Sequence, residues 1–88
     1  MTPGIIAVIG PVTTAARLAK KIEQTSGVSA RMIHTPEAVG GGGCSYSVKT
    51  KSEYLPVVMQ TAEKYKIKVK AYYIIEIAEG KEVYHDIS

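Results

Sequence analysis

The residue best equipped for chemistry is the single cysteine, Cys44, which directly follows four consecutive glycines at 40–43. A cysteine thiolate is a nucleophile, and nearby positive charge or backbone N–H groups lower the pKa of the thiol. Gly41, Gly42 and Gly43 place no side chain beside the sulfur and can turn successive N–H groups toward an anion. We therefore expect Cys44 to be a partly exposed, reactive thiol, with the three glycines as anion-binding residues.

Two simpler interpretations of this segment stay open. A free cysteine is often a small buried hydrophobic residue, and burial would raise the pKa of the thiol instead of lowering it. The glycines could form only a hairpin tip that binds nothing. Their spacing does not predict nucleotide binding, because no Gly-Lys-Ser/Thr follows and they do not open a helix.

The two histidines, His34 and His85, are the other side chains that could bind a metal or act as a base. Their spacing from each other and from Cys44 matches no local ligand motif. The sequence therefore predicts no metal site and no cofactor. No second member of a catalytic set is recognisable beside Cys44, which favours a carrier or binding protein over an enzyme.

The composition indicates one ordinary globular domain spanning residues 1–88. Hydrophobic residues make up 45% and charged residues 22% of the chain, and no segment approaches the roughly 20 apolar residues of a membrane span. The N-terminus has no signal-peptide pattern, and one cysteine excludes an internal disulfide, so a cytoplasmic location is expected. The net charge of +3 is too mild to predict nucleic-acid binding, and the alternating lysines at 64–70 are typical of a solvated segment.

The first half of the chain predicts a strand, a helix and a second strand. An unbroken apolar run at 5–9 is typical of a strand that is buried on both faces. Apolar residues at helical spacing predict a helix over 14–25, with Thr13 as its N-cap and Gly27 as its stop. A second strand follows at 28–34.

The second half repeats this order and adds a tail. A third strand is predicted at 44–49, with apolar and polar residues on opposite faces, and a second helix at 52–65. Ser52 is the preferred cap of that helix, because a capping box formed by Thr50 and Glu53 would leave Pro56 in the helix interior. The remaining predicted elements are a strand at 68–77, a turn at Glu79-Gly80 and a short strand at 82–87.

This order predicts an α+β domain with a ferredoxin-like βαββαβ sandwich, in which two helices cover one face of an antiparallel sheet and an extra strand or tail follows. In that fold the third strand lies between the first and the second. The start of the third strand then meets the start of the first helix. We therefore expect Cys44 to lie near Thr13 and Thr14, and the helix N-terminus to favour an anion there.

The sequence also resembles a known family. Thr13-Thr14 before the first helix, the stretch Ala30-Arg31-Met32-Ile33-His34-Thr35-Pro36 and the step Gly43-Cys44 resemble the selenium/sulfur (Se/S) carrier protein-like family over roughly residues 5–75. Members typically have Ser-Thr-Thr where this chain has Val12-Thr13-Thr14, and Cys-Gly where it has Cys44-Ser45. The resemblance carries over four positions: Cys44, Thr13, Thr14 and Arg31.

The resemblance implies a sulfur or selenium carrier that holds a persulfide or perselenide on Cys44. Its partners would be a donor protein and an acceptor protein. The alternative is a regulatory or structural interaction module that does no chemistry. A thiol-dependent enzyme is the weakest candidate. A homodimer is also expected, because the strand at 68–77 is richer in apolar residues than an unpaired edge strand should be.

Overall fold

The fold is organised around its first strand, β1 (Gly4–Gly10), in which every residue from Ile5 to Gly10 is buried. On one side β1 pairs antiparallel with β3 (Tyr46–Lys51), and on the other with β4 (Ala71–Ala78). A strand with neighbours on both edges and side chains covered on both faces needs a continuous apolar run. The prediction of a buried central strand at 5–9 is therefore confirmed.

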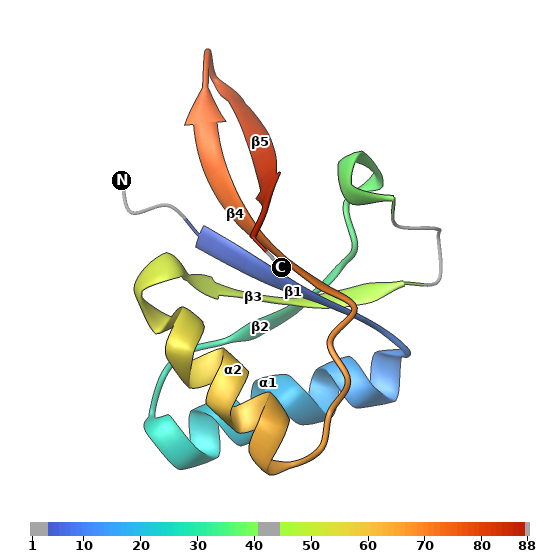
Figure 1. Ribbon diagram of the computed structural model, residues 1–88, viewed down its shortest axis with the longest axis vertical. Coiled ribbons are helices and arrows are strands. Elements are labelled where there is room, and N and C mark those ends of the chain that lie inside the picture. The colour runs from blue at the N-terminus through green and yellow to red at the C-terminus, as the bar shows by residue number, and fades with distance from the viewer. Residues whose placement is uncertain (1–3, 41–44, 88) are drawn as a thin grey trace.

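The computed structural model describes residues 4–40 and 45–87, and it contains one antiparallel sheet in the order β2-β3-β1-β4-β5 (Figure 1). The edge strands are β2 (Arg31–His34) and β5 (Lys81–Asp86). The element order is β-α-β-β-α-β-β, so β5 follows the βαββαβ order that was predicted. The mixed α+β class is confirmed, and the C-terminal segment is a strand rather than a loose tail.

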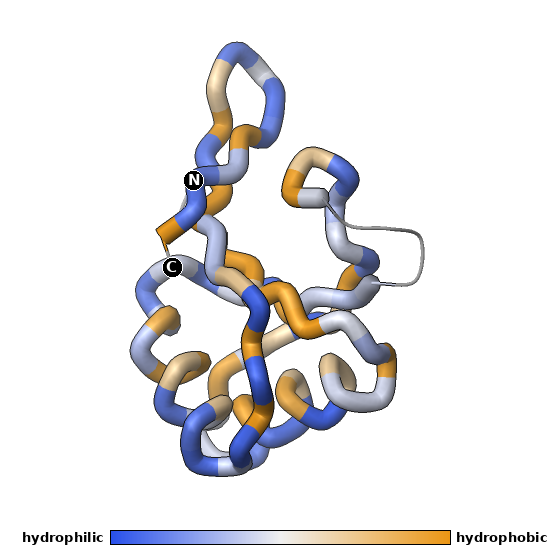
Figure 2. The backbone as a smooth tube through the Cα atoms, turned by 45° about the vertical axis from the view of Figure 1, so that its right-hand side comes forward, coloured by the Kyte–Doolittle hydropathy of each residue, from blue (hydrophilic) through white to orange (hydrophobic). Residues whose placement is uncertain are grey.

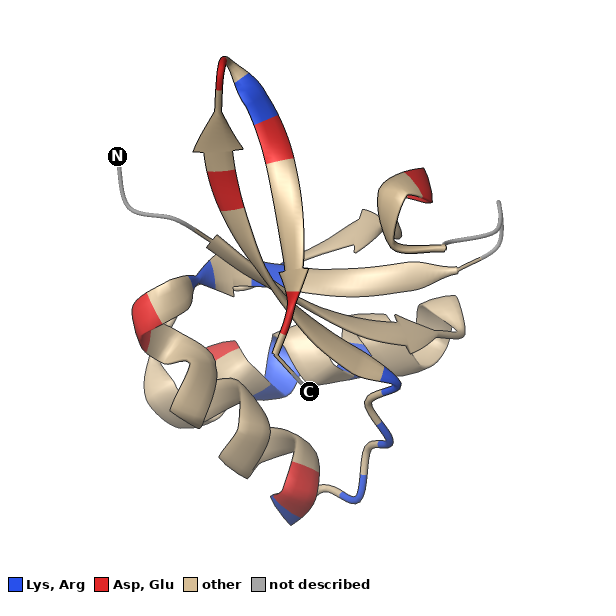
Figure 3. Ribbon diagram, turned by 45° about the horizontal axis from the view of Figure 1, so that its top comes forward, with Lys and Arg blue, Asp and Glu red and all other residues tan. Residues whose placement is uncertain are grey.

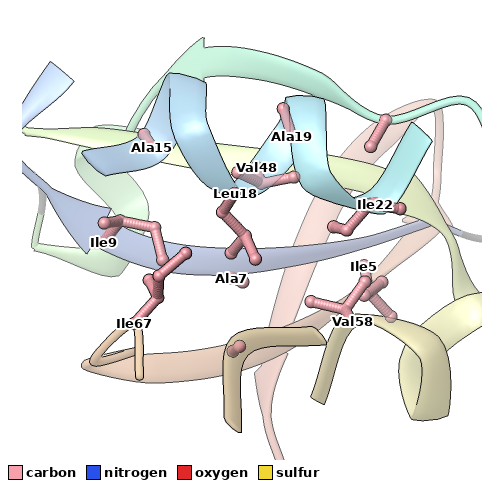
Figure 4. Packing of buried hydrophobic residues seen from close by; sticks show 12 residues of the cluster. Ile5, Ala7, Ile9, Ala15, Leu18, Ala19, Ile22, Val48, Val58 and Ile67 are labelled. Carbon is pink, nitrogen blue, oxygen red and sulfur yellow. The ribbon is translucent and has the colours of Figure 1, made fainter. Parts of the chain in front are cut away.

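Both helices lie on the same side of the sheet. Helix α1 (Val12–Ser26) and helix α2 (Leu55–Lys64) pack over one face of β1 and β3 (Figures 1 and 4). The prediction that both helices cover one face of the sheet is confirmed. The buried cluster between the helices and the sheet consists of Ile5, Ala7, Ile9, Ala15, Leu18, Ala19, Ile22, Ala30, Val48, Val58, Ala62 and Ile67, and Leu55 packs against it.

The N-terminus of α1 differs from the prediction. The helix begins at Val12 and its N-cap is Pro11, which makes no side-chain cap hydrogen bond. Thr13 therefore lies inside the first turn, and the prediction that it caps the helix is wrong. The chain turns early because Gly10 adopts φ +111°, next to a register shift in the pairing of β1 with β3. The predicted stop at Gly27 is confirmed, since Gly27 is the left-handed C-cap.

The start of α2 also differs. Residues Ser52–Tyr54 form a short 3₁₀ turn, η2, and Tyr54 rather than Ser52 is the N-cap of α2. Pro56 then falls in the first turn of the helix, where its missing N–H costs nothing. Thr50 lies within β3, which extends to Lys51 instead of ending at the predicted residue 49, so Thr50 does not cap the helix.

The strands are shorter than predicted at their starts. Strand β2 begins at Arg31 instead of residue 28, and β3 begins at Tyr46 instead of residue 44. Strand β4 begins at Ala71 instead of residue 68, because Lys66 takes a left-handed conformation after α2 and the chain is irregular until residue 70. The predicted turn at Glu79-Gly80 joins β4 to β5, with both residues at positive φ. No helix in the described ranges is long and apolar enough to cross a membrane.

Candidate functional site

Three chain segments meet at the edge of the sheet where β1 ends. Tyr46, the first residue of β3, pairs with Gly10 of β1 and with His34 of β2. One residue further out, the Thr35 backbone N–H donates to the Ser45 carbonyl at 2.9 Å. Helix α1 starts two residues after Gly10. The end of β1, the start of α1 and the end of the β2–β3 connection therefore lie together, as the predicted topology required.

Four of the predicted site residues, Gly41, Gly42, Gly43 and Cys44, lie outside the described residues. The chain is described on both sides of them. Before them, η1 (Glu37–Val39) ends at Gly40, whose N–H donates to the Glu37 carbonyl at 3.0 Å. After them, Ser45 is held against Thr35. The residues that flank this segment, Gly40 and Ser45, thus each take part in a backbone hydrogen bond.

A cluster of three hydroxyl groups supports the Ser45 side of this edge. The Thr35 Oγ1 lies 2.9 Å from the Ser45 Oγ and 2.7 Å from the Ser47 Oγ. Ser47 is fully buried, and Thr35 is only 6% exposed. Burying hydroxyl groups is favourable only when they bond to one another or to the backbone, so the three side chains fix the relative position of the two strands.

Sequence reasoning missed this cluster. The alternation in residues 45–48 predicts one apolar and one polar face, but it does not indicate that Ser47 on the polar face is buried. Ser47 pairs with Ile33 and Val8, so it faces the side of the sheet that does not carry the helices, and that side is itself partly covered. The available signal was the presence of two serines, Ser45 and Ser47, in the segment that lies beside Thr35.

The N-terminus of α1 provides an environment suited to an anion. Its first turn contains no acidic side chain and no side-chain cap, so backbone N–H groups of the first turn are left for another acceptor. Thr14 is half-buried and Thr13 is exposed. A hollow of about 260 Å³ lies beside this turn and is lined by Ile9, Pro11, Thr14, Lys68 and Lys70.

Two of the predicted lysines contribute to this region. The Lys70 backbone N–H donates to the Val8 carbonyl at 2.8 Å, which holds the irregular segment before β4 next to the end of β1. Figure 3 shows the basic residues of that segment following one another between α2 and β4. Lys68 and Lys70 are exposed, as predicted for the solvated segment, and both line the hollow at Thr14. Positive charge therefore accompanies the helix N-terminus.

Of the remaining candidate residues, Arg31 and His85 lie away from this edge, whereas His34 lies on it, paired with Tyr46. Arg31 begins β2 and pairs with Lys49, so it lies at the opposite end of the strand from His34. His34 stacks against Tyr46, with ring centroids 4.5 Å apart. His85 lies on β5, the far edge strand, where its Nε2 is 3.3 Å from a Glu76 carboxylate oxygen. The two histidines are thus on opposite edge strands, and no group of three metal-binding side chains occurs within residues 4–40 and 45–87.

Comparison with known proteins gives one match. The family model described as "Putative Se/S carrier protein-like" matches residues 6–74, a span that runs from β1 into β4 and includes Cys44. Searches of the curated proteins and of the solved structures returned no match. The matched residues cover most of the chain and contain the strand ends, the α1 N-terminus and the glycine and cysteine segment. The chain belongs to the Se/S carrier protein-like family.

Proposed function

We propose that the protein is a sulfur or selenium carrier that holds a persulfide or perselenide on Cys44 and delivers it to an acceptor protein. The observation that carries this proposal is the family match over residues 6–74, which includes the only cysteine of the chain. The chemistry then depends on one thiol and on the groups around it. Support comes from the edge of the sheet where α1 begins. Tyr46, which follows Ser45 in the sequence, pairs there with Gly10, two residues before the helix.

The proposed loading step transfers one sulfur atom without net oxidation. The Cys44 thiolate attacks the outer sulfur of a persulfide on the donor protein and forms a new S–S bond. The bond between the two donor sulfurs breaks, and the electron pair leaves with the donor thiolate, which takes up a proton. Delivery is the same exchange in the opposite sense, with an acceptor thiolate attacking the outer sulfur on Cys44. A selenium atom would follow the same sequence.

Both the thiolate and the persulfide are anions, so the carrier needs positive potential without a competing carboxylate. The first turn of α1 has free backbone N–H groups and no acidic residue, and Lys68 and Lys70 lie beside Thr14. Gly41, Gly42 and Gly43 would add backbone N–H groups next to the sulfur. In this proposal Thr13 and Thr14 contribute through the helix N-terminus, and the predicted low pKa of the Cys44 thiol is its chemical consequence.

We also assign the fold to the ferredoxin-like class and the protein to the cytoplasm. The order β2-β3-β1-β4, with two helices on one face, supports the first assignment, and β5 is then an addition. A free thiol that must stay reduced between transfers supports the second.

Mass spectrometry tests the carrier proposal directly. The protein is incubated with a cysteine desulfurase and cysteine, and intact masses are measured without reducing agent. We expect a gain of one sulfur atom per chain, and none in Cys44→Ala. Absence of the adduct on the wild type, or an equal adduct on Cys44→Ala, would refute the proposal. Repeating the experiment with a selenocysteine lyase and selenocysteine distinguishes selenium from sulfur.

The rate of alkylation tests the proposed anion environment separately. Reaction with iodoacetamide followed against pH reports the thiolate fraction, and we expect its midpoint below the value of about 8.5 for a free cysteine. Lys68→Ala combined with Lys70→Ala should move the midpoint upward, whereas Lys20→Ala, on the exposed side of α1, should leave it in place. A wild-type midpoint at or above that of a model thiol would remove the physical basis of the carrier.

An interaction module without chemistry is the second candidate, and one observation favours it. The sheet face opposite the helices is apolar, and in the described ranges no helix longer than the three-residue η1 covers it. Under this alternative Cys44→Ser would leave the cellular role of the protein intact, whereas a carrier would lose it completely.

A further inference from the structure

The face of the sheet opposite α1 and α2 is more apolar than a solvated face should be. It carries a second buried cluster, formed by Ile6, Val8 and Ile75 from the two central strands. Partly buried apolar residues surround this cluster, namely Ile33, Val39, Tyr73 and Tyr84. Antiparallel sheets that face water on one side normally carry polar residues there. We call this side of the sheet the open face, because in the described ranges no helix longer than η1 lies over it.

The hairpin formed by β4 and β5 rises from the side of the open face, away from the helices (Figure 1). Figure 2 shows hydrophilic residues at its tip and hydrophobic residues closer to the sheet. Two large apolar side chains on it are poorly covered: Ile77 is 58% exposed and Val83 is 37% exposed. A two-stranded hairpin is marginal in water on its own, and additional packing stabilises it.

The hairpin bends over the open face instead of continuing the plane of the sheet. The Lys49 Nζ in β3 lies 3.8 Å from a Glu82 carboxylate oxygen in β5, although β1 and β4 separate these two strands. Hairpin and sheet together bound a cavity of about 940 Å³.

The walls of this cavity carry opposite charges. Arg31, Lys49 and Lys51 line it on the β2 and β3 side, Glu82 lines it on the hairpin side, and Ile75 and Ile77 are between them. Tyr84 lies on the hairpin near Glu82. Burial raises the pKa of the Tyr84 hydroxyl, and the Glu82 carboxylate raises it further, so the hydroxyl remains neutral at physiological pH. In a two-fold dimer the same face of each protomer meets the other. The basic wall of one protomer can then lie opposite the acidic wall of its partner.

We propose that the open face is a homodimer interface in which the β4–β5 hairpin of each protomer packs on the β2 and β3 side of its partner. Ile77 would be covered by the partner's open face, and Glu82 would approach the basic wall formed by Arg31 and Lys51. The earlier expectation of pairing along the edge of β4 loses its basis, because β5 covers that edge. A partner whose surface carries charges of only one sign fits this face less well, because it would repel one of the two walls.

Sedimentation equilibrium of the full chain at several concentrations tests the proposal. We expect the mass of a dimer and a dissociation constant that rises with salt, since charges contribute to the contact. Ile77→Lys should weaken the dimer at least about tenfold, because the lysine charge would be buried in an apolar contact. The matched control is Met59→Lys, an exposed apolar position on α2 that is 45% exposed and lies on the opposite side. A monomer at all concentrations, or a dimer that Met59→Lys breaks and Ile77→Lys does not, would overturn the proposal.

Cross-linking of mixed protomers tests the arrangement. In a Cys44→Ser background, a Glu82→Cys chain is mixed with an Arg31→Cys chain under a mild thiol oxidant. We expect the mixed disulfide to form, and a Met59→Cys chain to give none with either. A dimer without the mixed disulfide would show a different interface and overturn the proposal. Because Cys44 is absent here, failure of the carrier proposal would leave the result unchanged.

Discussion

Thr35 and Ser47 are the residues on which the β2 to β3 pairing near the candidate site depends most. Ser47 is fully buried, and the Thr35 Oγ1 is its hydrogen-bond partner at 2.7 Å. Thr35→Val keeps the shape of the side chain and removes the hydroxyl, which leaves the Ser47 hydroxyl buried without this partner. We expect a loss of about 1–3 kcal/mol in the free energy of unfolding, measured by urea denaturation.

The double variant Thr35→Val with Ser47→Ala provides the control. It removes both members of the buried pair, so its cost should be smaller than the sum of the two single costs. Ser45→Ala, at the partly exposed end of the cluster, should cost less than Thr35→Val. Strict additivity of the two single variants would show that the hydroxyl groups act independently.

Tyr72 makes the stability of the protein depend on pH in the alkaline range. Burial raises the pKa of its hydroxyl above the ordinary value of 10.0, so the folded state retains the proton to higher pH than the unfolded state. The contribution of Tyr72 to stability should therefore be constant below about pH 10 and should be lost as the pH rises above it. Tyr72→Phe should reduce the slope of the urea midpoint between about pH 9 and about pH 11. An unchanged slope would show that Tyr72 is ionised equally in both states.

At the scale of the elements, the end of α1 depends on the left-handed backbone conformation of Gly27. Gly27 has φ +67°, and its N–H donates to the Glu23 carbonyl at 3.0 Å. A Cβ at this position would meet nothing within 4 Å, so Gly27→Ala introduces strain without a clash. We expect a loss of about 1 kcal/mol in urea denaturation. Gly27→Asn should lose less, because asparagine tolerates the left-handed region. Equal stability of all three chains would contradict this account.

The elements that periodicity predicts well are those whose environment follows from local sequence. The run Ile5 to Ile9 and the helical spacing of Leu18 and Ile22 predict a buried strand and a one-sided helix, and both form. The start of α1 could not be predicted in the same way. Thr13 is a good cap residue, but the bulge at Gly10 brings the chain into the helix before it reaches Thr13.

Strand topology is predictable from the sequence, but the side chains that line the candidate edge are not. The topology correctly brings the start of β3 to the start of α1, because strand order decides which ends share an edge. The hydroxyl cluster depends on the burial of Ser47, and residues distant in sequence produce that burial. Alternation alone cannot reveal it, since a polar residue on a covered face and one on a solvated face give the same pattern.

At the scale of the whole molecule, stability depends on the core between the helices and the sheet. Leu18 is fully buried there, among side chains of β1, α1 and α2 (Figure 4). Leu18→Ala should reduce the free energy of unfolding by about 3 kcal/mol. This is a large part of the total free energy of unfolding of a small domain, which is roughly 5–15 kcal/mol. Val12→Ala on the same helix is the control, because Val12 is exposed and its change should stay within about 0.5 kcal/mol. Similar losses in urea denaturation for both variants would contradict the assignment of this core.

The central position of β1 also affects the order in which the chain can fold during synthesis. The strand is completed at residue 10, but its two pairing partners are completed only at residues 51 and 78. Its apolar segment therefore emerges from the ribosome long before either edge can be covered. Pairings between such distant segments form late and slow the folding of the chain. A nascent chain of this protein would need protection of its first strand until most of the sequence has been translated.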